Sequence, residues 1–548
     1  MNVAEQIVKT LEVRGVQFVF GLPGEENIAL VNALEKSEQI KLVIAHDEQA
    51  ATFMAEVIGW LSDQPGVAIA TLGPGALNMA VAVADAHSHS LPIIAISAQG
   101  GVTTLHREEK QVVSLTDVFA PITTFSDYLR APESVSELVN KAYNEATADR
   151  TGASFIAIPA PFEQATLESA LPPVIEQPVA LMQPTASAIE QAAMIIREAT
   201  HPLIVAGFGA VRAGIASELT HFARQHQMPV ATTYMAKGII PEDDALSLGV
   251  LVFLVDDYLD EELSQFDTVL VVGVDFGELS PARFNPMQDK TLLHIHSYRP
   301  ETHGHYSLAA NLVGKMDQTL ETLSKELLDY QARPITLKIK QYLRQELAYG
   351  AEATDAPLTP VQIVHATRAV LGETDRALVD TGALKMWMAR LFPVDFPNQL
   401  MFSNAMSSMA WSLPGTIAAK LLEPDRRVLT VTGDGSFHMN MQELATAMRE
   451  NIPLTILVWD DGGYELIKWK MEMSLDESAG VSFQNPDFVR IAQAYGGRGH
   501  VAMSRNDLER VLRESLDREG IDIIVAPVDY SANLELSNQL ADHLESGC

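Results

Sequence analysis

The feature that most constrains the fold is a regular alternation between short apolar runs and stretches with helical periodicity along the 548 residues. Buried parallel strands joined by crossover helices produce this pattern, because both faces of such a sheet are covered. We therefore predict an α/β fold with three doubly wound parallel-sheet domains. The expected strands are 17–22, 41–46, 66–71, 91–97, 154–160, 202–208, 229–234, 268–274, 291–297, 377–382, 399–404, 427–433, 454–461 and 521–528.

Two proline-rich segments divide the chain. Residues 171–184 read LPPVIEQPVALMQP, and residues 352–360 read EATDAPLTP. Proline cannot continue a helix or serve a central strand, so both segments are predicted to be interdomain linkers. The predicted domains are 1–170, 185–340 and 358–548.

An internal similarity suggests that the outer two domains share one design. One expected strand runs into Gly73-Pro74-Gly75 and another into Gly433-Asp434-Gly435, and each turn is followed by a helical pattern and a further strand. A proline lies near the start of that next strand, 19 residues after Gly73 in the first case (Pro92) and 20 residues after Gly433 in the second (Pro453). We predict two topologically similar domains on either side of a different middle domain.

The charge balance argues against two classes of partner. The chain has 38 Lys and Arg against 71 Asp and Glu, a net charge of −33. Nucleic-acid binding needs a basic face that displaces counterions, and an anionic membrane attracts basic segments. The single cysteine, Cys548, excludes a disulfide scaffold, a cysteine zinc site and an iron–sulfur cluster within one chain.

The apolar stretches predict buried elements rather than targeting or membrane-spanning segments. Residues 1–15 predict an amphipathic helix without a continuous apolar run, so we expect no signal peptide. The longest uncharged stretch, 66–84, contains a Gly-Pro-Gly turn that would break a spanning helix, and it predicts a buried strand, turn and helix. We expect a cytoplasmic protein.

The strongest site signal is the sequence TGDGSFHMNMQEL at 432–444, followed by LVWDDGGYELI at 457–467. Glycines after a strand, ahead of a helix, can form a phosphate cradle. Asp434 and Asp461 follow two successive strands, and parallel strands end at one edge, so the two carboxylates and a backbone carbonyl could hold Mg²⁺. The alternative is a helix-capping Asp434 and a polar turn at 460–461, because Asp-Gly turns are frequent.

With the other motifs in order, the chain resembles the thiamine-diphosphate-dependent enzymes, and most closely the acetolactate synthase large (catalytic) subunits. The motifs are FGLPGEEN (20–27), HDEQAA (46–51), ATLGPGALN (70–78), VDTGALKMW (379–387) and SNAMSSMAWSLPGTIAAKLLEPDR (403–426). The resemblance covers essentially the whole chain. It implies a pyrimidine-binding first domain, a central domain and a diphosphate-binding last domain, with thiamine diphosphate and Mg²⁺ as cofactors.

The resemblance gives Glu48 a catalytic role. In the family, the Glu at this position binds the pyrimidine ring of the cofactor and promotes the imino form that removes a proton from the thiazolium carbon. This is proton transfer directed by a positioned carboxylate. From the residues alone, the alternative is a first-turn Glu favoured by the helix dipole.

The remaining cofactor and metal residues are carried over from the matching motifs. Asp434 and Asp461 match the metal ligands, together with the carbonyl of Gly463, and Asp461 stands where many relatives have Asn. Ala383 and Leu384 replace a Gln-His pair of many acetolactate synthases and lack its side-chain donors. The cofactor-binding positions so implied are Gly24, Glu48, Asn78, Gly382, Ala383, Leu384, Met409, Gly433, Gly435, Ser436 and Tyr464.

Four further residues receive roles from the family resemblance. Met409 matches the apolar residue that props the cofactor in its bent shape, and the alternative is a core methionine. Gln111 matches a catalytic pocket Gln. Trp469 and Lys468 fall where the family shapes the acceptor pocket, and the alternative is an amphipathic surface helix.

The middle domain contains GFGAVRAG at 207–214, after an expected strand. Gly207 and Gly209 begin a dinucleotide fingerprint, but Arg212 takes the place of its third glycine. Some relatives bind FAD in this domain and others do not. We expect no FAD here.

The function implied is decarboxylation of pyruvate and carboligation to a second 2-ketoacid, which yields 2-acetolactate and CO₂. Such an enzyme would serve branched-chain amino acid biosynthesis or a catabolic role, as a dimer or tetramer with shared active sites. The alternatives are another thiamine-diphosphate 2-ketoacid decarboxylase or carboligase, and a non-catalytic scaffold. The sequence leaves the acceptor and any regulatory subunit open.

Overall fold

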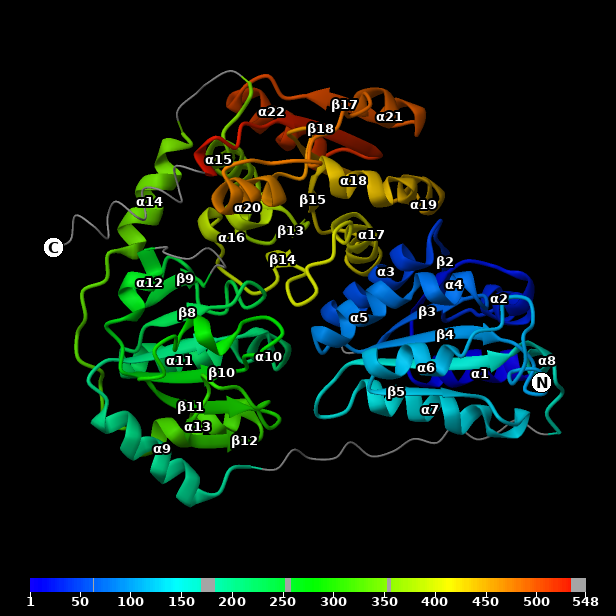
Figure 1. Ribbon diagram of the computed structural model, residues 1–548, viewed down its shortest axis with the longest axis horizontal. Helices are drawn as coiled ribbons and strands as arrows, with labels where there is room; N and C mark the ends of the chain where they lie inside the picture. The colour runs from blue at the N-terminus through cyan, green and yellow to red at the C-terminus, as the bar shows by residue number, and fades with distance from the viewer. Residues whose placement is uncertain (63, 169–182, 252–257, 352–355, 534–548) are drawn as a thin grey trace. The chain divides into compact units, whose positions relative to one another are not determined.

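The framework of the protein is three six-stranded sheets (Figure 1). The computed structural model describes residues 1–62, 64–168, 183–251, 258–351 and 356–533. Every strand pairing with a defined register is parallel. The predicted α/β fold with three doubly wound parallel sheets is therefore confirmed. Most of the expected linker 171–184, the start of the linker 352–360, and Cys548 lie outside the described residues.

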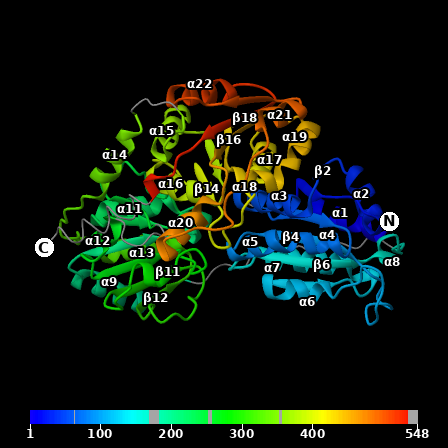
Figure 2. The same cartoon turned by 45° about the horizontal axis from the view of Figure 1, so that its top comes forward.

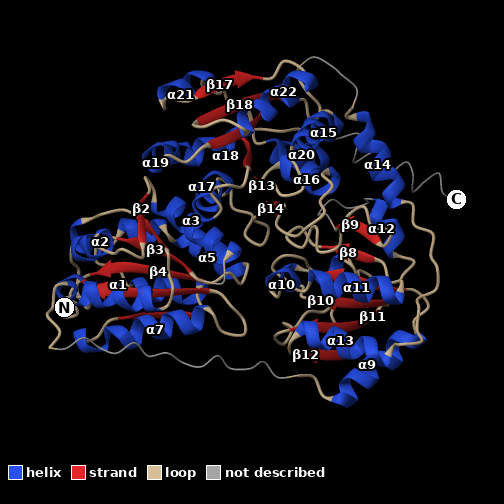
Figure 3. Cartoon of the chain, turned by 180° about the vertical axis from the view of Figure 1, so that it is seen from behind, coloured by secondary structure: helices blue, strands red, loops and turns tan. Residues whose placement is uncertain are grey.

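The first sheet has the order β2-β1-β3-β4-β6-β5. Helices α1 and α7 pack with the apolar residues of one face, and α3 lies against β3 on the other (Figure 3). The predicted strand, turn and helix at 66–84 appear as β3, α4 and α5. Its strands are β1 (Phe18–Gly21), β2 (Lys41–Ile44), β3 (Gly66–Ala70), β4 (Ile93–Gln99), β5 (Phe125–Tyr128) and β6 (Ala153–Pro159). Its helices are α1 (Val3–Val13), η1 (Glu25–Asn27), α2 (Ile28–Glu35), α3 (Glu48–Leu61), α4 (Pro74–Asn78), α5 (Ala80–Ser88), α6 (Leu115–Phe119), η2 (Ala120–Ile122), η3 (Pro132–Ser134), α7 (Val135–Ala146) and α8 (Ala160–Glu163).

The last sheet repeats this topology. Its order, β14-β13-β15-β16-β18-β17, is that of the first sheet when both are numbered from their first strand, so the predicted similarity of the outer sheets is confirmed. Its strands are β13 (Arg376–Val379), β14 (Leu400–Phe402), β15 (Val428–Gly433), β16 (Leu454–Asp460), β17 (Arg498–Val501) and β18 (Ile521–Pro527). The helices of this part are α15 (Pro360–Val370), α16 (Ala383–Leu391), α17 (Ser412–Leu422), α18 (Asp434–Asn440), η5 (Met441–Glu443), α19 (Leu444–Glu450), α20 (Glu465–Leu475), α21 (Phe488–Ala494) and α22 (Arg505–Leu516).

The central sheet is different. Its order β12-β11-β10-β7-β8-β9 is the dinucleotide-binding arrangement, and separate apolar clusters cover its two faces. Its strands are β7 (Pro202–Ala206), β8 (Val230–Thr232), β9 (Ser247–Val250), β10 (Thr268–Val272), β11 (Thr291–His296) and β12 (Leu308–Val313). Its helices are α9 (Ala186–Glu198), α10 (Phe208–Arg212), α11 (Ala216–His226), α12 (Tyr258–Leu263), η4 (Pro281–Arg283), α13 (Met316–Glu326) and α14 (Ile339–Tyr349).

Local sequence signals explain where several of these helices begin. Asn2 and Glu5 form a capping box at the start of α1, and Thr359 and Gln362 form one at α15. The side chain of Asp47 accepts hydrogen bonds from the first backbone N–H groups of α3. These caps satisfy donors that a helix end leaves unpaired.

The described chain separates into two compact units. The first contains the first sheet together with segments 406–425 and 439–454, so α17, η5 and α19 belong to it, and the second contains the central and last sheets (Figure 2). The predicted domain boundaries stay a prediction. Within the described ranges, every helix is too short or too polar to span a bilayer.

Candidate active site

The first cluster of predicted site residues lies at the carboxyl edge of the first sheet. Strand β2 ends at Ile44 and α3 begins at Glu48, while β3 leads into the turn that precedes α4. The neighbours β1, β2 and β3 run parallel, so the turns that follow them meet at one edge. This edge brings Glu48 and Asn78 together from different crossovers.

Glu48 is a nearly buried carboxylate with a side-chain donor beside it. Its side chain is 9% exposed, and its Oε2 accepts a hydrogen bond of 3.0 Å from Asn78 Nδ2. A Cβ atom at Gly75 would lie 2.8 Å from Glu48 Oε1, closer than carbon and oxygen can approach. Glycine is therefore required at position 75 for the carboxylate to lie there.

The glycine turns around Glu48 also contact other predicted residues. A Cβ at Gly73 would meet Cβ of the exposed Gln111 at 2.9 Å, so the backbone of Gln111 lies directly on the Gly73 turn. Gly24 donates its N–H to Asn27 Oδ1 over 2.7 Å and packs against Thr71. The structure thus brings these residues to the same edge.

Met409 belongs to the segment 406–425 of the same compact unit. It is half-buried, immediately before Ala410, whose carbonyl accepts a hydrogen bond of 2.9 Å from Asn440 Nδ2. Its assignment as the cofactor prop stays a prediction.

The second cluster lies at the carboxyl edge of the last sheet, in the second compact unit. Asp434 begins α18 directly after β15, and Asp461 follows the last residue of β16. These strands are adjacent and parallel, with Gly433 opposite Trp459. The adjacency predicted from the sequence is what places the two carboxylates together.

Asp434 is 1% exposed and fully engaged in hydrogen bonds. Its Oδ1 accepts from the Gly435 N–H at 2.7 Å, and its Oδ2 accepts from the Gly462 N–H at 2.8 Å and from Asn485 Nδ2 at 2.6 Å. Burial raises the pKa of Asp434, and these hydrogen bonds oppose the rise. The carboxylate is thereby held in one orientation.

Asp461 shows the opposite pattern, because its buried Oδ2 has no hydrogen-bond partner. Burial, and then the charge of Asp434, raise the pKa of Asp461 to about 8. A Cβ at Gly463 would lie 3.6 Å from this oxygen, so the Gly463 backbone is close to it. An unpartnered buried carboxylate oxygen near a second carboxylate, with the Gly463 backbone close by, offers the oxygen ligands that Mg²⁺ prefers.

The turns that follow β13, β15 and β16 carry the other predicted residues near these carboxylates. Gly382 precedes α16 at the end of β13, and the Leu384 side chain packs 3.2 Å from where a Gly433 Cβ would be. Ser436 is buried and its Oγ donates to the Thr381 carbonyl at 3.4 Å. Ala383 is the first residue of α16 and is buried.

The ring of Tyr464, in the loop between β16 and α20, packs against the same edge of the sheet. A Cβ at Gly435 would lie 2.8 Å from the Tyr464 ring, so only glycine leaves room for the ring. The Tyr464 N–H donates to the Val481 carbonyl over 2.8 Å. The predicted cofactor-binding residues at the turns of the last sheet therefore lie at one edge, and their roles stay predictions. These residues are Gly382, Ala383, Leu384, Gly433, Gly435, Ser436 and Tyr464.

The two predicted acceptor-pocket residues differ in setting. Trp469 is the buried residue of α20, at 1% exposure, on a helix whose other residues are partly or fully exposed. This is the pattern of an amphipathic surface helix, the alternative to the acceptor-pocket role. The Lys468 ammonium is paired with Glu465 at 3.3 Å, and its side chain is partly exposed. The assignment of both to an acceptor pocket stays a prediction.

The sequence reasoning missed Asn485. Its Nδ2 donates to Asp434 and, at 2.6 Å, to Asp460 Oδ1, and its Oδ1 lies 2.9 Å from His438 Nε2. Because the amide oxygen can only accept, His438 carries a proton on Nε2. The only signal in the sequence is an Asn-Pro pair at 485–486, which by itself indicates no more than a turn.

The turn after β7 in the central sheet is filled by the protein itself. Arg212 pairs with Asp275 over 3.0 Å, and a Cβ at Gly209 would meet His296 Nε2 at 2.7 Å. Glu278 Oε2 accepts from the Phe208 N–H, at 3.2 Å, at the start of α10. Protein groups thus occupy the place where a dinucleotide phosphate would bind in this topology.

Comparison with known protein families gives three matches in chain order. Residues 1–118 match the N-terminal TPP binding domain of thiamine pyrophosphate enzymes, residues 189–323 match their central domain, and residues 380–526 match their C-terminal TPP binding domain.

Curated proteins similar to the chain cover nearly all of it. An acetolactate synthase of Bacillus subtilis is 29% identical over 98% of this chain and 94% of its own length. A catabolic acetolactate synthase of Raoultella terrigena is 29% identical over 98% and 97%. A probable acetolactate synthase large subunit of Methanocaldococcus jannaschii is 28% identical over 96% and 93%.

Proposed function

The chain belongs to the thiamine pyrophosphate enzyme family, and from that premise we propose that it is an acetolactate synthase. In the proposed reaction two molecules of pyruvate and one proton give 2-acetolactate and CO₂. The observation that carries the proposal is the pair of polar clusters at equivalent edges of two sheets with one topology. Glu48 follows the strand that corresponds to β14, and Asp434 follows the strand that corresponds to β3.

The bound cofactor would supply the chemistry that the side chains lack. Thiamine diphosphate, when bound, provides a nucleophilic carbon and an electron sink for decarboxylation. Glu48 would hold its proton-accepting carboxylate against the pyrimidine ring, with Asn78 fixing the orientation of that carboxylate. Gly75 supports this role because the absence of a side chain there leaves room for the Glu48 carboxylate.

The second cluster would hold Mg²⁺ and the diphosphate. Asp434, Asp461 and the Gly463 carbonyl supply hard oxygen ligands, and the free Asp461 Oδ2 supports a cation at this place. The backbone N–H groups at the start of α18, near Gly435 and Ser436, would face the diphosphate. An Asp at 461 adds one negative charge relative to an Asn ligand.

The proposed substrate contacts are Gln111 of the first cluster and two residues of α20. Gln111, next to the Gly73 turn, is the proposed polar contact on the first cluster. Trp469 and Lys468 would bound the acceptor, with an indole face for the ketoacid carbon chain and an ammonium for its carboxylate. One similar protein is a catabolic acetolactate synthase and another is named acetolactate synthase alone, so we propose no choice between a biosynthetic and a catabolic role.

We propose that the enzyme works without FAD. Two features at α10 support this: the Arg212–Asp275 ion pair and the Glu278 carboxylate. An anionic nucleotide bound at this turn would need an unpaired positive charge or free backbone N–H groups, and these contacts already use them. The purified enzyme should be colourless. Absorbance near 450 nm, which is a property of flavins, would contradict the proposal.

We propose a homodimer or a tetramer built from dimers, with active sites shared between chains. Exposed apolar side chains flank the first cluster, with Leu77 at 40% and Val81 at 45% exposure on either side of Asn78. Others lie on α20 next to the second cluster, with Ile467 at 46% and Met473 at 54%. Such apolar surface beside polar sites is typical of surfaces that a partner chain covers.

The experiment is an incubation of the purified protein with pyruvate, Mg²⁺ and thiamine diphosphate, followed by NMR identification of the products. We expect 2-acetolactate, and acetoin after acid treatment. The Glu48→Gln variant and a reaction without the cofactor are the controls. Acetaldehyde as the sole product, or no consumption of pyruvate, would contradict the proposal.

A further inference from the structure

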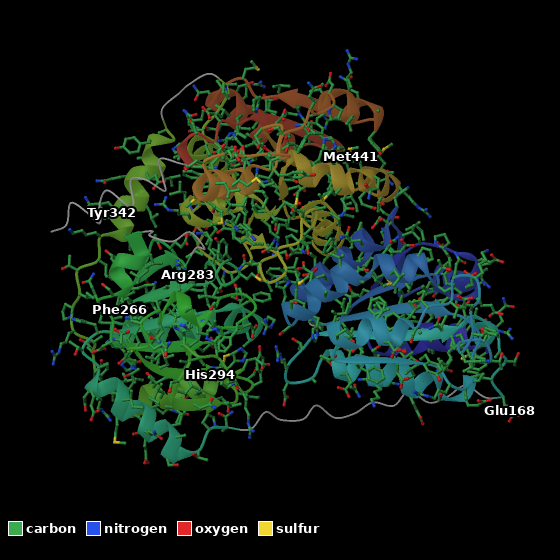
Figure 4. All side chains as sticks on the ribbon, in the orientation of Figure 1. Glu168, Phe266, Arg283, His294, Tyr342 and Met441 are labelled. Atoms are coloured by element: carbon green, nitrogen blue, oxygen red, sulfur yellow. The ribbon has the colours of Figure 1, made fainter. Side chains whose placement is uncertain are left out.

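The segment 439–454 carries a buried carboxylate that no proposed catalytic step uses. Glu443 is the last residue of η5, which begins at Met441, labelled in Figure 4, and it directly precedes α19. Its side chain is fully buried. Nine positions earlier, the same stretch of chain carries Asp434. A fully buried carboxylate needs hydrogen-bond donors around it, so the groups that donate to Glu443 indicate which part of the chain it holds in place.

The partners of Glu443 are the residues immediately before Glu48. The His46 N–H donates to Glu443 Oε1 at 3.1 Å, and the Asp47 N–H also donates to this carboxylate. The Thr446 hydroxyl donates to Oε2 at 2.6 Å. Because that hydroxyl proton is used, Thr446 Oγ1 accepts from His46 Nδ1 at 3.1 Å.

These contacts fix the short turn between β2 and α3. The turn consists of residues 45–47, and Asp47 is the N-cap of α3. Backbone N–H groups ahead of a helix have no partner within the helix, so an external carboxylate determines how the chain enters it. Glu48 is the first residue after that entry, and its side-chain position depends on the direction in which α3 starts.

We propose that Glu443 is the positioning residue for Glu48. Its carboxylate clamps the backbone of His46 and Asp47, and this holds the Glu48 carboxylate at the cofactor's pyrimidine ring. The inference rests on the proposed function, in which Glu48 activates the cofactor. Under this proposal, residues 434–443, which begin with the proposed metal ligand Asp434, also determine the position of the Glu48 carboxylate of the same chain.

The direct readout is exchange of the reactive thiazolium proton for deuterium in bound thiamine diphosphate, without pyruvate. Quenched-flow ¹H NMR measures this rate, which reports on Glu48 and not on carboligation. We expect Glu443→Gln to slow the exchange by roughly 10²-fold, because a displacement of about 1 Å can cost this much. The dissociation constants of thiamine diphosphate and Mg²⁺, measured by calorimetry, should change by less than about threefold, because Glu443 contacts the turn before Glu48 and is not among the residues proposed to hold the metal or the diphosphate.

Glu450→Gln is the matched control. Glu450 lies at the end of α19 and pairs with Lys41, at the start of β2, over 2.8 Å, so it joins the same elements at the end of β2 away from Glu48. This variant should exchange the proton at the wild-type rate. Equal slowing in both variants, or loss of cofactor binding in parallel with the exchange rate, would show a structural role and overturn the proposal.

Two further variants keep the test decisive. Thr446→Val removes one donor to Glu443 and should slow the exchange several-fold even if Glu443→Gln does not fold. Wild-type exchange in Thr446→Val together with an unfolded Glu443→Gln would overturn the proposal. In the Glu48→Gln background, Glu443→Gln should slow the exchange no further, because it acts through Glu48.

The same variants distinguish a failure of the proposed role of Glu48 from a failure of the proposed role of Glu443. If Glu48→Gln exchanges at the wild-type rate, the proposed role of Glu48 has failed, and with it the premise. If Glu48→Gln abolishes exchange while Glu443→Gln exchanges like the wild type, only the positioning role of Glu443 is wrong.

Discussion

Asn485 donates a hydrogen bond of 2.6 Å to Asp434, across 51 positions of sequence. The same amide also donates to Asp460, so it holds two carboxylates that would otherwise repel each other. The orientation of Asp434 is thus set from a loop outside both strands. Groups that orient a ligand in this way typically change metal affinity by 10- to 100-fold when they are removed.

We therefore expect Asn485→Ala to weaken Mn²⁺ binding by about 10- to 100-fold, measured by EPR in the presence of thiamine diphosphate. Gln484→Ala is the control, since Gln484 is the exposed neighbour. Unchanged Mn²⁺ affinity in Asn485→Ala would mean that this hydrogen bond does not orient the ligand.

Glu48→Gln should lower turnover by about 10²- to 10⁴-fold, the usual cost of losing one acid–base group. The amide preserves the volume of the side chain and can still bond to Asn78, so the melting temperature and Mg²⁺ binding should be nearly unchanged. Steady-state kinetics with pyruvate measure the effect. Full activity in this variant would refute the assignment of Glu48.

The metal assignment predicts different outcomes at the two aspartates. Asp461→Asn should retain Mg²⁺-dependent activity, because an amide oxygen still ligates, whereas Asp434→Ala should lose cofactor binding at ordinary Mg²⁺ concentrations. Calorimetric titration of thiamine diphosphate measures both. If EDTA-treated protein binds the cofactor as tightly as the untreated protein, the metal bridge is wrong.

Glu163 predicts a pH dependence of stability. Burial raises the pKa of Glu163 to about 7, although it accepts the backbone N–H groups of Ala29 and Leu30 at the start of α2. An unfolded Glu titrates near pH 4.3. Between these values only the folded state keeps the proton, so this group lowers the stability as the pH rises from about 4 to about 7.

Glu163→Gln cannot titrate, and it should flatten that part of the profile. Urea unfolding of both proteins at about pH 5 and about pH 7 measures the difference. The wild type should lose more stability than the variant over this interval. An equal loss would show that Glu163 does not keep its proton in the folded state.

Shared sites predict complementation between two inactive variants. Co-expression of Glu48→Gln and Asp434→Ala makes about half of the dimers mixed, and each mixed dimer has both lesions in one site and none in the other. About a quarter of the wild-type activity should return. No recovery in mass-verified mixed dimers would place each active site within one chain.

The strands that could be predicted from the sequence are the buried ones. The expected runs coincide with the interior strands of all three sheets and with β2 and β14. Among the described residues, the strands that escaped prediction are β5, β9, β12 and β17, and each lies at a sheet edge. An edge strand is covered less completely, and FSDY in β5 and RGHV in β17 therefore lack the apolar run that marks a buried strand.

The site was predictable where one short motif carries the chemistry. Asp434 and Asp461 each directly follow one of two adjacent parallel strands, so the rule that parallel strands end at one edge was enough to bring these two carboxylates together. The role of Glu48 was predicted from the resemblance of its motif to the family. Asn485 and Glu443 act through contacts 51 and 397 positions away in sequence. No periodicity or spacing encodes such contacts, because they depend on how loops and helices pack after the sheets have formed.

The most direct test of the account is the ratio of pyruvate consumed to CO₂ released, with Mg²⁺ and thiamine diphosphate as the only additions. Carboligation of two pyruvates consumes two molecules for each CO₂, and we expect that ratio together with one 2-acetolactate per CO₂. A ratio of one pyruvate per CO₂, with acetaldehyde as the product, would mean a simple decarboxylase and would contradict the central claim.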